Sequence, residues 1–125
     1  MFRLNKFTND RLNDTKPKAA VMLVHGHLDS SDTWIVNGER SYAFILADAG
    51  YDVYLHNTRG NKYSMGHVKY DSAISKEYWE GCQPDNQAKY DISAAVELIK
   101  DVSKVDSVSV ISHSLGSRSM ILNLE

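Results

Sequence analysis

Short apolar runs alternate with longer amphipathic stretches along the chain, a pattern typical of strands alternating with helices. Residues 19–24 form a continuous apolar run that ends in His25-Gly26, which predicts a strand covered on both faces. Residues 51–56 and 107–111 are rich in β-branched or aromatic side chains and predict two more strands. Residues 2–7 are predicted as an additional strand, followed by a polar turn over residues 9–16.

Three helices are expected between and after these strands. Residues 41–49 are predicted to present one apolar stripe and to end before Gly50, the stripe being Tyr42, Ile45, Leu46 and Ala49. A second helix is predicted from Asp91 onward, because apolar residues recur at helical spacing at Ile92, Ala95, Val96, Ile99 and Val102. Residues 115–124 predict a third helix, and a long loop is expected up to about Gln87.

Strands that alternate with helices predict an α/β fold, with a parallel sheet flanked by helices and right-handed crossovers. The 125 residues fit within one domain, and 42% apolar with 24% charged residues is typical of globular proteins. In parallel sheets, ligands bind at the carboxyl ends of the strands. We therefore expect the chemistry at that edge.

The charge pattern excludes several partner classes. The formal net charge is −2 and the basic residues are scattered, which argues against nucleic acid and acidic membranes. Cys82 is the only cysteine, so no internal disulfide and no zinc site built on paired cysteines is expected. Residues 1–18 show no signal peptide and no apolar run is long enough for a membrane helix, so the compartment is left open.

The segment Ser112-His113-Ser114-Leu115-Gly116 matches the nucleophile elbow GxSxG except for serine at its first position. The elbow needs small residues two before and two after the nucleophile, and serine is small. Ser114 could instead cap the helix that follows, since serine is a favoured N-cap. The predicted strand before it and helix after it favour the nucleophile.

The loop after the first long strand is the expected place for the second oxyanion amide. The candidates are the backbone amides of His27 and Leu115. No metal site and no cofactor are expected, because no two histidines stand at the helical spacing of a zinc motif. The base and acid of an elbow serine come later in the chain, and nothing after Gly116 is histidine or aspartate.

Several ordered blocks along the chain resemble one known family, the gastric and lysosomal acid lipases. These blocks are His25-Gly26, residues 28–34, residues 43–53 and residues 57–61, with two shorter ones at residues 75–79 and 88–92. The resemblance covers nearly the whole chain. It implies a partial α/β-hydrolase domain over residues 1–125, truncated after the elbow helix and lacking the cap and the C-terminal part.

The resemblance also implies the activity. The family hydrolyses acylglycerols and cholesteryl esters with a Ser-Asp-His triad, of which only Ser114 carries over, and its members are secreted or lysosomal. The family pattern has leucine at His27, glycine at Ser112 and glutamine at Leu115.

Two hypotheses follow from the sequence. The first is a lipid ester hydrolase in which Ser114 attacks the acyl carbonyl and the His27 and Leu115 amides hold the oxyanion. The second is a catalytically inactive, hydrolase-derived interaction subunit of a larger assembly. Both predict that another chain or a missing segment covers an open sheet edge.

Overall fold

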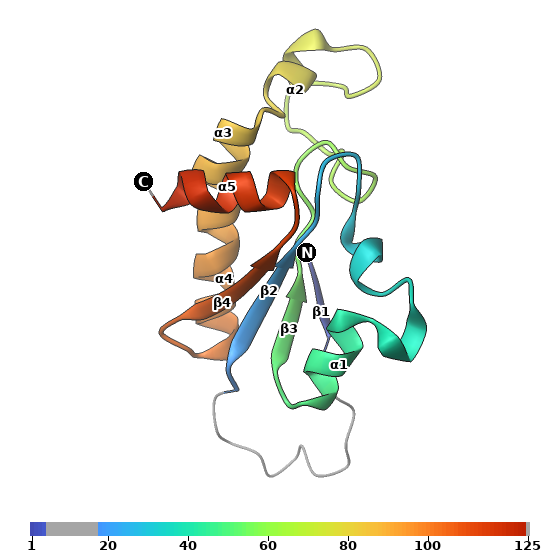
Figure 1. The fold of residues 1–125 in the computed structure, drawn as a ribbon. Coiled ribbons are helices and arrows are strands. Elements are labelled where there is room, and N and C mark those ends of the chain that lie inside the picture. Colours follow the sequence, from blue (N-terminus) through green and yellow to red (C-terminus); the bar gives the residue numbers. More distant parts are fainter. Residues whose placement is uncertain (5–17, 125) are drawn as a thin grey trace.

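The computed structural model describes residues 1–4 and 18–124, in which four strands form one sheet (Figure 1). The strand order is β1 (Phe2–Leu4), β3 (Asp52–Leu55), β2 (Ala20–Val24) and β4 (Val108–Ser112). β3, β2 and β4 are parallel, whereas β1 is antiparallel to β3. The fold is therefore α/β as predicted, but the sheet is mixed because the short edge strand β1 runs in the opposite direction.

The helical elements, in chain order, are η2 (Ser31–Trp34), η3 (Gly38–Arg40), α1 (Tyr42–Asp48), α2 (Lys76–Glu80), α3 (Pro84–Asn86), η4 (Gln87–Ile92), α4 (Ser93–Ser103) and α5 (Leu115–Asn123). α3, the π-helical η4 and α4 follow one another without a break. None of the helices among the described residues is long and apolar enough to cross a membrane.

The predicted start of one helix and one predicted loop need correction. The helix expected from Asp91 begins at Pro84, because proline fits the first helical turn, where its missing N–H is not needed. The long loop expected up to Gln87 contains α2, in which only Tyr78 is buried, so the segment has no apolar periodicity to reveal it. The predicted strand over residues 2–7 is present as β1, while residues 5–7 and the turn at 9–16 lie outside the described residues.

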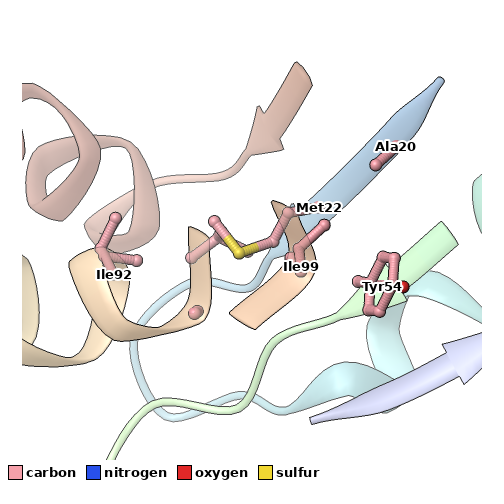
Figure 2. Close-up of a cluster of buried hydrophobic side chains, with 7 residues drawn as sticks. Ala20, Met22, Tyr54, Ile92 and Ile99 are labelled. Carbon is pink, nitrogen blue, oxygen red and sulfur yellow. The ribbon is translucent and has the colours of Figure 1, made fainter. Parts of the chain in front are cut away.

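β2 is the centre of the core and is buried on both faces, as predicted. Its even-numbered residues, Ala20, Met22 and Val24, pack with Tyr54, Ile92, Ala95 and Ile99 (Figure 2). Its odd-numbered residues, Val21 and Leu23, pack on the other face with Trp34, Ala43, Ala47, Val53 and Leu55. α4 and α1 therefore cover opposite faces of the sheet.

The buried face of α1 differs from the predicted stripe. Ala43 and Ala47 face the sheet, whereas Tyr42 and Ile45 are exposed. Small side chains let the helix approach the sheet closely. The predicted stripe is therefore correct for Leu46, which packs against the core, and wrong for Tyr42, Ile45 and Ala49, which are exposed.

The apolar run at residues 107–111 predicts a buried parallel strand, and β4 is parallel to β2 but is not buried. Val108 and Val110 pack against the core, whereas Ser109 and Ile111 are exposed. Among the described strands, β4 pairs with β2 on one side and has no strand on the other. An edge strand with one covered face shows this alternation.

Candidate active site

Ser114 lies on the tight turn that joins β4 to α5. Its backbone has φ 52° and ψ −118°, a left-handed conformation that non-glycine residues rarely adopt. Ser114 stands at the N-cap position of α5, but its side chain makes no capping hydrogen bond, so the structure does not support a capping role for its hydroxyl. The strand, turn and helix around Ser114 thus have the order expected of a nucleophile elbow.

The start of α5 packs directly against the end of β2. A Cβ atom on Gly116 would lie 2.5 Å from the carbonyl oxygen of His25 and 2.9 Å from Cγ1 of Val24. A Cβ on Gly26 would lie 2.9 Å from Nδ1 of His113. Glycine is therefore required at position 116 for strand and helix to meet.

Serine fits at the first elbow position, where the family pattern has glycine. Ser112 is half-buried at the end of β4, and its hydroxyl lies 3.0 Å from that of Ser117. The extra hydroxyl is thus paired inside the elbow. The neighbouring amide of His113 donates to the carbonyl oxygen of Val24 at 3.1 Å, which ties the turn to β2.

A cavity of about 1090 Å³ lies beside Ser114. The loops that follow all three parallel strands line it, with His27 and Leu28 after β2, residues 58–62 after β3, and Ser114 to Gly116 with Arg118 after β4. The three predicted site residues, His27, Ser114 and Leu115, therefore lie around one cavity at the carboxyl ends of the strands.

The amides of His27 and Leu115 donate no hydrogen bond to any described residue. For Leu115 the reason is its position as the first residue of α5, because the first N–H groups of a helix have no intrahelical acceptor. Such amides at a helix start attract negative charge.

His25 is buried and links two of the loops around the cavity. Its Nε2 accepts from the Thr58 amide at 3.2 Å and from Nδ2 of Asn61 at 3.0 Å. Because both partners are donors, the ring is neutral with its proton on Nδ1, which donates to the Gly26 carbonyl at 2.7 Å. Its ring nitrogens are thus engaged in holding the loops, so His25 cannot serve as base for Ser114.

The loop after β3 is held by side chains that sequence reasoning did not single out. Oδ1 of Asn57 accepts from the Ser31 amide at 3.0 Å and from Nδ2 of Asn61 at 2.7 Å. Nε and Nη2 of Arg59 donate to the carboxylate of Asp91 at 2.8 and 2.5 Å, and this pairing raises the pKa of Arg59. The signals in the sequence were the blocks at residues 57–61 and 88–92 that resemble the family.

The other histidines are distributed through the described part of the chain. His27 and His113 are exposed near Ser114, and His67 stacks on Tyr70. His56 is buried, its Nε2 has no hydrogen-bond partner among the described residues, and burial lowers its pKa to about 4. Within residues 1–4 and 18–124, no three His, Cys, Asp or Glu side chains are grouped to hold a metal ion.

Cys82 lines the same cavity as a half-buried free thiol. Its Sγ lies 3.4 Å from the carbonyl oxygen of Tyr78, and burial raises the pKa of the thiol. A thiol in that state stays protonated and is a poor nucleophile. The structure therefore gives no support for Cys82 as a nucleophile.

No family model matches the chain. Among curated proteins, it is 44% identical to mouse lipase member K over 82% of this chain and 26% of that protein. It is 39% identical to human lysosomal acid lipase/cholesteryl ester hydrolase over 91% of this chain and 29% of that protein. It is 37% identical to lipase lipl-3 of Caenorhabditis elegans over 99% of this chain and 31% of that protein. The chain thus spans between a quarter and a third of the length of these relatives.

Proposed function

Because the chain is related in sequence to the acid lipases, we propose that it carries the nucleophile and the oxyanion hole of a serine hydrolase acting on lipid esters. The observation that carries this proposal is the left-handed backbone of Ser114 between β4 and α5. Strain of this kind persists only where the surrounding structure imposes it, and it is concentrated at functional sites.

The roles of the three site residues follow from their positions. The Ser114 hydroxyl attacks the acyl carbonyl, and the carbonyl oxygen becomes an oxyanion in the tetrahedral intermediate. The amides of His27 and Leu115 donate to that oxyanion, and removing one such donor typically slows an enzyme by about 10²–10³-fold. The alcohol then leaves, and water hydrolyses the acyl-enzyme.

Both proposed oxyanion donors are backbone N–H groups, so the unusual side chains at positions 27 and 115 do not remove them. An oxyanion amide acts through its N–H, so histidine at position 27 and leucine at position 115 leave the donors in place. The Ser112 hydroxyl is paired with Ser117. None of the three departures from the family pattern therefore removes a group that the proposed mechanism uses.

The proton of the Ser114 hydroxyl needs a base. His25 is occupied by its loop contacts, and the side chain of His56 is buried. We place the acid and the catalytic histidine in a segment or chain outside these 125 residues, since the relatives are three to four times as long. That segment or chain would also supply a cap over the cavity.

The proposed substrate class is a lipid ester. One relative is named as a cholesteryl ester hydrolase, and the others are named as lipases. A cavity of about 1090 Å³ is at the upper end of ordinary ligand sites, which suits an extended acyl chain.

The second candidate is an inactive, hydrolase-derived interaction subunit. The observation that favours it is the exposed face and edge of β4, where Ile111 and Ser109 are open to solvent and no described strand pairs beyond them. Edge strands of this kind readily pair with another segment.

Turnover of 4-nitrophenyl butyrate distinguishes the two candidates. It is measured on the protein with all its natural segments and partners. Ser114→Ala should lower kcat by at least about 10³-fold, because a triad without its nucleophile retains only residual catalysis. Ser109→Ala, an exposed serine on the preceding strand, is the matched control and should leave kcat unchanged. Turnover that survives Ser114→Ala would contradict the nucleophile, and a folded wild-type protein without turnover would favour the interaction subunit.

Residues 1–125 produced alone should show no esterase activity above the Ser114→Ala background and should not persist as a monomer. The hydroxyl lacks its base, and the edge of β4 invites association. The mass in solution tests whether the chain is a monomer, and ester turnover tests whether it is active. A monomer with Ser114-dependent turnover would mean that His27 or His113 serves as base.

A further inference from the structure

The charged side chains that line the cavity beside Ser114 are Asp29, Asp32, Arg59, Lys62 and Arg118. Asp32 forms an ion pair with Lys62 and also accepts from the hydroxyl of Tyr63 at 2.9 Å. Arg59 is paired with Asp91. Arg118 makes no ion pair and no side-chain hydrogen bond with any described residue, so it is the cation of the cavity that lacks a counter-charge there.

Arg118 is placed to act close to the nucleophile. It lies on α5, four positions after Ser114 and three after Leu115. Residues three or four apart share one face of a helix, and side chains lean toward the N-terminal end. The guanidinium therefore leans toward the end of α5 that carries Ser114, and the N-terminal end of the helix adds partial positive charge there.

The nearby carboxylate does not cancel this charge. Asp29 is the remaining acidic side chain of the cavity, and its Oδ1 accepts from the Ser30 amide at 2.7 Å. It forms no ion pair with Arg118. Arg118, which is exposed, therefore lines the same cavity as the His27 and Leu115 amides, and neither amide donates a hydrogen bond to a described residue.

We propose that Arg118 binds an anionic oxygen group, a carboxylate or a phosphate, carried by the ester a few bonds from its scissile carbonyl. A guanidinium matches either group with two parallel hydrogen bonds. The cavity then selects acidic esters over uncharged ones of the same length. The identity of the ligand as an ester rests on the proposed function, whereas the binding of an anion by Arg118 does not.

The test compares two small esters that differ in charge. Monomethyl glutarate carries a carboxylate, and dimethyl glutarate is its uncharged analogue. Binding is measured by calorimetry on the protein with Ser114→Ala, so that neither ester is hydrolysed. We expect the acidic ester to bind about tenfold more tightly at low salt, which is typical of hydrogen bonds to a charged group. The preference should shrink as salt is added.

Variants of Arg118 decide the outcome. Adding Arg118→Gln should abolish the preference for the acidic ester, and Arg118→Lys should retain part of it. Arg40→Gln, which changes an exposed arginine of η3 outside the cavity, is the matched control and should keep the full preference. Displacement of the bound probe by acetate and by inorganic phosphate then ranks the two anions.

A preference that persists in Arg118→Gln, or that is absent from the parent, would overturn the inference. Because no turnover is measured, this result would leave the role of Ser114 untouched. Conversely, an inactive Ser114 would not alter the calorimetric comparison.

Discussion

The two loop regions that frame the cavity are fixed in different ways. The elbow is held by packing against the backbone, because Gly116 leaves no space for a Cβ atom against the carbonyl oxygen of His25, and Gly26 in the loop after β2 lies against the side chain of His113. The loop after β3 is held by side-chain hydrogen bonds, among them Arg59 with Asp91. The first region depends on glycines, which have no side chain, and the second depends on the polar groups of side chains.

This difference determines what each region tolerates. A steric contact with backbone atoms cannot be relieved by a rotamer change, so substitutions at the elbow should disrupt the fold itself. A hydrogen-bonded loop can lose one partner and keep the others, so its substitutions should be graded. Three predictions follow in order of decreasing expected effect, and those at Gly116 and Asp91 test this contrast directly.

Gly116→Ala should destabilise the protein by about 4 kcal/mol, at the upper end of overpacking effects, because its Cβ would lie 2.5 Å from the His25 carbonyl oxygen. The higher helix propensity of alanine offsets only about 1 kcal/mol of this. Urea unfolding measures the change. Gly66→Ala is the control, since a Cβ atom there would meet nothing within 4 Å. Equal destabilisation by the two substitutions would contradict the role given to backbone packing at Gly116.

His56 should make the stability depend on pH. Its pKa is lowered from 6.5 to about 4 by burial, so the folded protein holds it neutral. The unfolded chain takes up the proton first, and stability is therefore lost as the pH falls from about 6.5 to about 4. The loss is on the order of 3 kcal/mol for a shift of this size.

The measurement is the free energy of unfolding at several pH values for the wild type and for His56→Gln. Removing the titrating group should flatten the curve between pH 6.5 and 4, whatever the substitution does to absolute stability. Identical slopes for the wild type and His56→Gln would refute the assignment.

Asp91→Asn should destabilise by roughly 1–2 kcal/mol, between the values for exposed and buried ion pairs, because the side chains of Arg59 and Asp91 are 33% and 18% exposed. Arg59 keeps its contact with the Gly81 carbonyl at 3.2 Å, so the loop should stay partly ordered. Thermal unfolding measures the effect. Asp101→Asn removes a solvent-exposed ion pair with Lys104 and should not change the midpoint of thermal unfolding. An equal shift of the midpoint in both variants would count against a stabilising role for the Arg59–Asp91 pair.

Local patterns in the sequence predicted the sheet and the elbow well. The runs at residues 19–24, 51–56 and 107–111 correspond to β2, β3 and β4 to within one residue at every bound, because apolar and β-branched runs are local features. The turn at Ser114 followed from its neighbours. These predictions needed no knowledge of distant residues.

The features that the sequence did not predict depend on contacts between distant segments. Arg59 and Asp91 are 32 positions apart, and His25 meets Thr58 across 33 positions, so no spacing rule links them. The buried face of α1 is set by how closely the helix approaches the sheet. The half-exposed state of β4 depends on which strands lie beside it.

The pairing of β2 with β4 has a consequence for the order of folding. Ala20 lies opposite Val108, so this ladder joins residues 88 positions apart, and Val24 opposite Ser112 fixes the strand end that leads into Ser114. Closing so long a loop costs entropy before any contact is gained, and such pairings slow folding. We therefore expect β2 and β3, whose partners are about 32 positions apart, to associate first. The turn at Ser114 takes its final conformation only when β4 docks, so the cavity is completed at a late stage of folding.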